Sequence, residues 1–229
     1  MINIVIWGDL YVDSNFLINF LEMYNAQVIT KKHHTYLTYY GLEQQYTYVL
    51  KEGIIKTSII LKDGREFNIS YINTPNIISL LRDEVSEYTS SPFNVRVESK
   101  EAVFYKIPRV TFWKYVHDST ELQEYINNYY RNELSNSIQK RQITTMNSKK
   151  GAVCAFLYKL IDMFGKKDGE GYLIDFPITN EDIGGFCGIS TRSSVNRILH
   201  ELKKEKIIDI DNDIIRILDV DYLFGFVLN

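Results

Sequence analysis

The chain has 229 residues, which is enough for one large domain or for two modest domains with proper hydrophobic cores. Its residues are 45% apolar and 24% charged, which excludes a disordered or fibrous protein, and no apolar run reaches the roughly 20 residues of a membrane helix. The formal net charge is −3, and the two cysteines, Cys154 and Cys187, exclude a four-cysteine zinc site or a cysteine-ligated iron–sulfur cluster within one chain.

The first residues do not have the pattern of a signal peptide. Residues 2–7 are apolar, but no basic region precedes them, and the acidic Asp9 and Asp13 follow directly. Two free thiols are also typical of a reducing compartment. We therefore expect a cytoplasmic protein without a membrane partner.

The first hundred residues predict mainly β-strands. Alternating or β-branched runs occupy residues 46–50, 54–61, 66–72, 95–97 and 102–107. Asp63 and Gly64, between two of these runs, indicate a hairpin with a type I′ turn, because that turn needs positive φ at both central residues. The spacing of the runs predicts an antiparallel sandwich or roll.

Helical spacing begins after Pro108, which ends the sheet region. Asp118 and Glu121 form the pattern of a capping box, and a helix of about 25 residues is predicted to follow. Its apolar residues come at steps of four: Leu122, Ile126, Tyr130, Leu134 and Ile138. A second, more apolar helix is predicted over residues 151–164, and a polar loop over residues 166–171.

The most specific pattern lies in the last quarter of the chain. Thr179 and Asp182 predict a capping box at the start of a short helix, which ends at Gly188, a residue suited to a left-handed turn. Ser190 or Thr191 then caps the next helix. Four apolar residues of that helix form one buried stripe: Val195, Ile198, Leu199 and Leu202.

The opposite face of this helix is basic and carries hydroxyl groups. On a helical wheel with about 100° per residue, four side chains lie roughly opposite the stripe: Ser193, Arg197, His200 and Lys204. Residues 140–206 contain 12 Lys and Arg against 8 Asp and Glu, and a local basic face can bind phosphates. This arrangement is typical of a helix-turn-helix, and residues 207–210 and 214–218 predict the hairpin of a wing. The alternative is a solvated amphipathic helix hairpin in an unrelated domain.

Residues 178–198 resemble the helix-turn-helix signature of the Crp/Fnr transcription regulators. The segment Ile-Thr-Asn-Glu-Asp-Ile-Gly at 178–184 is similar to the family's Thr-x-x-Glu-Ile-Gly. The segment Gly-Ile-Ser-Thr-Arg-Ser-Ser-Val-Asn-Arg at 188–197 is similar to its Gly-x-Ser-Arg-Glu-Thr-Val-x-Arg. One extra residue precedes Val195, as in the PrfA-like branch of the family.

The resemblance implies an α+β chain in three parts. Residues 1–110 would form an antiparallel β-roll like a cyclic-nucleotide-binding domain, residues 111–147 a long dimerisation helix and hinge, and residues 148–229 a winged helix-turn-helix. The five apolar residues at steps of four would then make the contact between two copies. The implied partners are double-stranded operator DNA, a second copy of the chain and RNA polymerase.

Matching positions of the motif imply the residues that contact DNA. The complete expected set is Arg192, Ser193, Asn196, Arg197, His200 and Lys204. Arg197 is supported by the motif and by the wheel, and an arginine can donate two parallel hydrogen bonds to guanine. Ser193 stands where the family commonly has Glu, and a hydroxyl discriminates less between bases than a carboxylate does. Arg192 projects about 60° from Val195 on the wheel, away from the basic face.

No cofactor or metal is expected. In nucleotide-binding members of the family a Gly-Glu-Leu turn and a following Arg-Ser or Arg-Thr pair hold the ribose and the phosphate, whereas residues 74–92 contain no glycine here. Arg82 is the only cation of this stretch, and Asp83, Glu84 and Glu87 would repel a phosphate. A cyclic nucleotide, an iron–sulfur cluster and haem are therefore not expected.

Signatures of an enzyme are missing from the sequence, which contains no Gly-rich phosphate loop, no nucleophile elbow and no His-x-x-x-His. Both cysteines are expected to be buried small hydrophobes, with a redox-sensing thiol at Cys187 as the alternative. The chain is thus predicted to be a homodimeric regulator that reads an inverted-repeat operator through residues 191–205. The rival is a module that binds a non-DNA ligand or a protein and uses its β-roll as a sensor.

Overall fold

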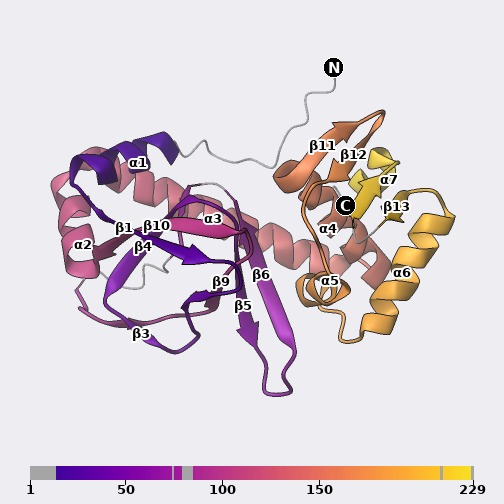
Figure 1. Ribbon diagram of the computed structural model, residues 1–229, viewed down its shortest axis with the longest axis horizontal. Helices are drawn as coiled ribbons and strands as arrows, with labels where there is room; N and C mark the ends of the chain where they lie inside the picture. Colours follow the sequence, from indigo (N-terminus) through magenta and orange to yellow (C-terminus); the bar gives the residue numbers. More distant parts are fainter. Residues whose placement is uncertain (1–13, 74, 79–84, 212–213, 228–229) are drawn as a thin grey trace. The chain divides into compact units, whose positions relative to one another are not determined.

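The computed structural model describes residues 14–73, 75–78, 85–211 and 214–227 (Figure 1). The chain divides into two compact units, one of residues up to 59 with 70–137, and the other of residues 60–69 with 138 onward. The apolar segment 2–7, Arg82, Asp83 and Glu84 lie outside the described residues. Within the described ranges, no helix is long and apolar enough to cross a bilayer.

The first unit is built around two antiparallel four-stranded sheets, as the spacing of the sequence runs predicts. One sheet has the order β1-β10-β4-β7, the other has β2-β9-β5-β6, and β3 pairs with β8. The strands are β1 (Gln27–Lys32), β2 (Tyr36–Thr38), β3 (Glu43–Gln44), β4 (Tyr46–Glu52), β5 (Ile55–Ile60), β6 (Glu66–Ile72), β7 (Asn76–Ile77), β8 (Thr89–Ser90), β9 (Asn94–Val97) and β10 (Glu101–Pro108).

The strands β4 and β10 are buried on both faces, and their side chains alternate between two apolar clusters. Leu50 and Phe104 point into the cluster inside the roll. Val49 and Tyr105, one residue along each strand, point into the cluster on the other face of their sheet. Successive side chains of a strand face opposite ways, so these two strands separate the inner core from the outer core.

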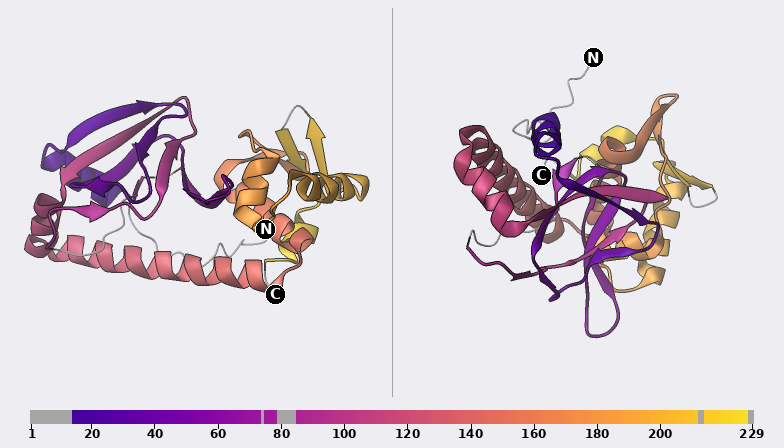
Figure 2. Two further views of the ribbon diagram at one scale, coloured as in Figure 1. Left: turned by 90° about the horizontal axis from the view of Figure 1, so that it is seen from below. Right: turned by 60° about the vertical axis from the view of Figure 1, so that its left-hand side comes forward.

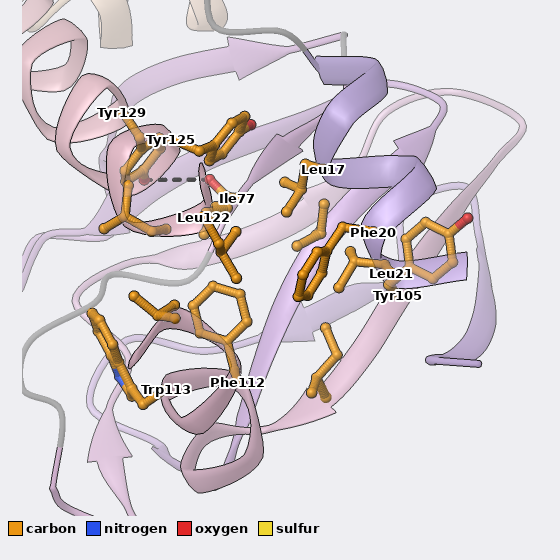
Figure 3. Packing of buried hydrophobic residues seen from close by; sticks show 14 residues of the cluster. Leu17, Phe20, Leu21, Ile77, Tyr105, Phe112, Trp113, Leu122, Tyr125 and Tyr129 are labelled. Carbon is orange, nitrogen blue, oxygen red and sulfur yellow. Dashed lines mark hydrogen bonds between the residues drawn. The ribbon is translucent and has the colours of Figure 1, made fainter. Parts of the chain in front are cut away.

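Three helices complete the outer core: α1 (Ser14–Met23), α2 (Arg109–Asp118) and α3 (Thr120–Met146). Leu17, Phe112 and Leu122 meet there, each fully buried, and the Tyr129 hydroxyl donates a hydrogen bond to the Ile77 carbonyl at 3.3 Å (Figure 3). The sequence does not predict α1 and α2, because β-branched and aromatic residues favour a strand locally while burial against the sheet decides for a helix.

The long helix α3 is uninterrupted, as Figure 2 shows. The prediction of Asp118 as its capping residue is wrong by one position. The Leu122 amide donates to the Ser119 hydroxyl at 3.2 Å, and the same hydroxyl bonds to the Glu121 carboxylate at 3.0 Å. Ser119 is therefore the residue that caps α3, and Asp118 ends the preceding helix.

The hairpin between β5 and β6 exists, but its predicted type I′ turn is wrong. Gly64 has φ of 84°, while Asp63 is not among the residues with positive φ. The Leu61 amide donates to the Arg65 carbonyl at 2.8 Å, which closes a loop of three residues. A three-residue loop with a left-handed glycine at its end needs positive φ only at that glycine.

The second unit is a small helical domain with a four-stranded sheet of order β11-β12-β14-β13. Its elements are α4 (Lys149–Phe164), β11 (Gly165–Asp168), β12 (Gly171–Ile174), α5 (Asn180–Cys187), α6 (Arg192–Lys204), β13 (Ile208–Asp211), β14 (Ile214–Ile217) and α7 (Val220–Phe224). The prediction of a polar loop over residues 166–171 is wrong. These residues belong to the β11–β12 hairpin, which turns at Gly169 with φ of 60°.

Candidate functional site

The helices α5 and α6 form the helix-turn-helix that the sequence predicts. The capping box at the start of α5 is complete: the Asp182 amide donates to the Thr179 hydroxyl at 3.0 Å, and the Thr179 amide donates to the Asp182 carboxylate at 3.2 Å. Gly188 ends α5 in the left-handed conformation, with φ of 66° and ψ of 26°. Any other residue at Gly188 would strain the turn that redirects the chain into α6.

The helix α6 begins at Thr191, whose side chain accepts a hydrogen bond from the Ser194 amide at 3.4 Å. This hydrogen bond selects Thr191 over Ser190 as the capping residue. The predicted stripe is confirmed, since Val195, Ile198, Leu199 and Leu202 are all buried. The apolar stripe fixes the rotation of α6 and thereby leaves the basic face outward.

Ion pairs at the C-terminal half of α6 hold the helix on its domain. The Lys203 ammonium lies 2.7 Å from the Asp209 carboxylate and donates to the Ile210 carbonyl at 3.0 Å, which ties α6 to β13. Lys150 of α4 reaches Glu201 at 3.0 Å and Glu205 at 2.9 Å. Lys203 and the two acidic residues thus have structural partners.

Four of the six expected DNA-contacting side chains share the open face of α6. Ser193, Arg197, His200 and Lys204 are exposed. The side chains of Arg197, His200 and Lys204 make no hydrogen bond or ion pair with the part of the chain that the structure describes. We call these four residues the open face.

The other two expected residues make contacts with α5. Arg192 forms an exposed ion pair with Glu181 at 3.3 Å, and Asn196 accepts a hydrogen bond from the Asn180 side chain. The helical wheel already directs Arg192 away from the basic face, and the structure agrees with the wheel. An exposed ion pair is worth little, so Arg192 could exchange Glu181 for another partner at small cost.

The wing predicted after α6 is present as the antiparallel pair β13–β14, with Ile208 opposite Ile217 and Asp211 opposite Ile214. Its tip, residues 212–213, lies outside the described residues. Arg216 of β14 pairs with Asp168 of β11 at 2.5 Å. This cation is therefore already engaged within the sheet.

A set of hydrogen bonds that the sequence does not predict connects α3 to α5 through Asn68. The Lys140 ammonium on α3 donates to the carbonyls of Asn68 and Ile69 at 3.0 and 2.6 Å, and the Asn68 amide donates to the Asp182 carbonyl at 3.2 Å. Burial lowers the pKa of Lys140 to about 8. A side chain on Gly185 would collide with Asn68 and Glu66, so a glycine is needed there. The partners are far apart in sequence, and no local pattern reveals them.

The expected dimerisation stripe is split between a buried and an exposed part. Leu122 and Ile126 are 0% and 4% exposed and belong to the outer core of the first unit, whereas Leu134 and Ile138 are 63% and 59% exposed. Tyr130 lies between these extremes, at 38%. Steps of four residues rotate the stripe by about 40° each, so its two ends face different directions. This corrects the expectation for Leu122 and Ile126, because their own unit already covers them.

The cysteines are set among apolar groups. Cys154 is fully buried, and the Cys187 thiol donates to the Ala152 carbonyl at 3.5 Å. Burial raises the pKa of each thiol to about 12. Lys140, which is distant in sequence, lowers the pKa of Cys187, but burial has the larger effect.

We expect both thiols to be unreactive in the folded protein. The thiolate is the reacting form, and a pKa near 12 reduces its population at pH 8 about a thousandfold relative to an ordinary cysteine. Iodoacetamide labelling followed by mass spectrometry should therefore be at least about a hundredfold slower than in the same chain unfolded in guanidinium. Rapid labelling of Cys187 in the folded chain would instead support the redox-sensing alternative.

One small cavity lies among the described residues of the roll. The cavity there has a volume of about 20 Å³, and Tyr48, Ile78 and Ser90 are among its lining residues. A volume of this size holds roughly one water molecule.

Comparisons with known proteins agree with these features. A sequence profile described as the Crp-like helix-turn-helix domain matches residues 151–224. The lactate racemization regulatory protein of Lactiplantibacillus plantarum is 58% identical over 217 residues, which cover 95% of this chain and 98% of that protein. The listeriolysin regulatory protein of Listeria monocytogenes is 28% identical over 182 residues, or 79% of this chain and 76% of that protein. The solved structure of FixK2 from Bradyrhizobium japonicum has a TM-score of 0.75 at 15% identity, covers 89% of this chain and 98% of its own, and shares the fold.

Proposed function

Because the chain belongs to the Crp/Fnr family of DNA-binding transcription regulators, we propose that it works as a homodimer that reads an inverted-repeat operator through residues 191–205. The open face of α6 is the observation that carries this proposal. Side chains that combine a guanidinium, an ammonium and a hydroxyl on one exposed helix suit base edges and phosphates in a major groove. The proposed parts are a sensor domain at 1–110, a linking helix at 111–147 and a DNA-binding domain at 148–229.

The relative with 58% identity indicates a biological setting. The name of that relative refers to the racemization of lactate. We propose that this chain likewise controls genes for the interconversion of lactate enantiomers, acting in the cytoplasm on double-stranded operator DNA and through RNA polymerase.

The rival function is a module that binds a non-DNA ligand or a protein. A mobility-shift titration of duplex DNA at several salt concentrations separates the two. A protein that neutralises phosphates loses affinity as salt rises, because counterions are released on binding. Binding that is strong, specific and salt-dependent supports the proposed function, and no shift at low salt supports the rival.

Lys204→Ala should weaken binding to all duplexes alike. Lysine acts as a point charge on phosphates, so its loss lowers the slope of log affinity against log salt by about 1 and leaves the sequence preference unchanged. Lys203→Ala is the matched control, because Lys203 is ion-paired with Asp209. Fluorescence anisotropy with operator and unrelated duplexes measures both slopes. A sequence-dependent loss for Lys204→Ala would contradict this role.

Cyclic AMP should neither bind nor alter operator affinity. The roll cavity of about 20 Å³ is far too small for a nucleotide, and Glu87 in the expected phosphate region is acidic. Calorimetry with millimolar cyclic AMP should show no saturable heat. A micromolar isotherm together with tighter DNA binding would contradict this expectation.

A further inference from the structure

Two polar contacts join the start of α5 to one flank of α6. The Asn180 side-chain amide donates a hydrogen bond to Asn196 Oδ1, and the Arg192 guanidinium lies 3.3 Å from the Glu181 carboxylate. Asn180 and Glu181 are the first residues of α5, directly after its capping residue Thr179. Arg192 and Asn196 are four positions apart on α6, so they share one flank of that helix.

Asn196 lies between this flank and the open face. It follows Val195 of the buried stripe by one residue, so it projects about 100° from Val195, next to an open face that spans roughly 140–200°. Asn196 is exposed and belongs to the N-terminal half of α6. The N-terminal part of a recognition helix contacts base edges in the major groove. A duplex that meets Arg197 is therefore within reach of the Asn196 amide as well.

The contact with Asn180 decides which end of the Asn196 amide is free. The oxygen of a side-chain amide accepts hydrogen bonds, and its nitrogen donates them. Because Asn180 donates to Oδ1, the oxygen end of Asn196 is directed to α5. None of the described residues accepts a hydrogen bond from Asn196 Nδ2. Asn196 thus presents its donors on the exposed side.

A free donor distinguishes two kinds of base. In the major groove guanine and thymine present a carbonyl oxygen, whereas adenine and cytosine present an amino group. A donor that faces a carbonyl forms a hydrogen bond, and a donor that faces an amino group leaves two donors unpaired, which costs free energy. The Nδ2 group of Asn196 therefore favours guanine or thymine.

We propose that Asn180 is a positioning residue, which makes Asn196 select guanine or thymine at one position of each half-site. The inference rests on the proposed function, because it requires duplex DNA against α6. Asn180 is not among the residues expected to contact DNA, and it acts by holding the amide of Asn196 in one orientation.

Asn180→Asp should reverse this preference. A carboxylate accepts hydrogen bonds but does not donate them, so it would pair with Asn196 Nδ2 and turn Oδ1 outward. An outward oxygen accepts from the amino group of adenine or cytosine. The variant should fold, because Thr179 and Asp182 still form the capping box of α5 and a negative charge near the start of a helix is favourable.

Selection of bound sequences from random duplexes by the full chain and by Asn196→Ala identifies the base position concerned. The unaltered chain should prefer guanine or thymine there by about fivefold to 150-fold, the range for one mismatched base pair. Asn196→Ala should lose this preference, and Asn180→Ala should reduce it to less than about threefold. Asn180→Asp should select adenine or cytosine at the same position. Its added charge weakens all duplexes alike, so it cancels when bases are compared within one variant.

Glu181→Gln is the matched control. It changes the charge by the same amount at the next residue of α5, but the partner of Glu181 is Arg192, so the base preference should stay as it is. Uniform weakening by Asn180→Asp with an unchanged preference would mean a merely structural role and would overturn the inference. A preference of the unaltered chain for adenine or cytosine at this position, or no preference lost in Asn196→Ala, would also overturn it.

The same selection separates this inference from the proposed function. If the unaltered chain enriches an operator and Asn180→Asp keeps its preference, the inference is wrong and the proposed function stands. If the unaltered chain enriches no sequence, the proposed function is overturned, and the inference with it.

Discussion

Arg197→Ala should cost about 1–3 kcal/mol of discrimination between the operator and duplexes that differ at one guanine, which is about fivefold to 150-fold in relative affinity. The guanidinium is exposed on the open face and has no partner in the described part of the chain, so it is available for two parallel hydrogen bonds to guanine O6 and N7. Anisotropy titrations at one fixed salt concentration, with the operator and its single-base variants, measure the effect.

Arg192→Ala is the matched control for this experiment. It removes the same charge from the same helix, but the Arg192 side chain is directed to Glu181 at 3.3 Å. We expect Arg192→Ala to weaken all duplexes by a similar small factor and to keep the discrimination. If Arg192→Ala loses the discrimination and Arg197→Ala retains it, the open face has been assigned to the wrong side of α6.

The double variant Leu134→Asp/Ile138→Asp should produce monomers and lower operator affinity at least about a hundredfold, because two linked half-site contacts become one. Both side chains are more than half exposed on α3, so they are available for the contact between two copies that we propose. Sedimentation equilibrium measures the assembly, and anisotropy measures the affinity.

Asn136→Asp controls for the added charge, since it lies on the other side of the same helix about 160° to 200° away. It should leave both the dimer and the operator affinity unchanged. Ile126→Asp is unsuitable as a test, because Ile126 is 4% exposed and a charge there would destabilise the first unit itself. A dimer that survives the double variant would place the interface elsewhere.

The sequence predicts best those features that depend on neighbours along the chain. The capping box at Thr179, the left-handed Gly188 and the stripe through Val195 each rest on residues within four positions of one another, and the structure contains all three. The long strands of the roll are predicted for the same reason, since alternation is a local property. The structure contains the predicted hairpin at Gly64, but its turn is not the predicted type I′ turn.

Features that depend on distant neighbours could not be read from the sequence. Lys140 contacts Asn68 across 72 residues, and the Tyr105 hydroxyl donates to the Glu22 carboxylate across 83 residues. The spacing of the apolar stripe on α3 is correct, but periodicity does not show what covers each residue. For Leu122 that cover is its own unit, and for Leu134 we propose a second copy of the chain.

The central claim is that this chain is a dimer that reads two half-sites on one face of duplex DNA. Selection of bound sequences from a pool of random duplexes by the purified full chain tests it most directly. We predict an inverted repeat whose half-site centres lie about 34 Å apart, one turn of the DNA helix, with at least one guanine in each half-site whose preference is lost in Arg197→Ala. A pool without enrichment, or one dominated by a single asymmetric site, would contradict the account.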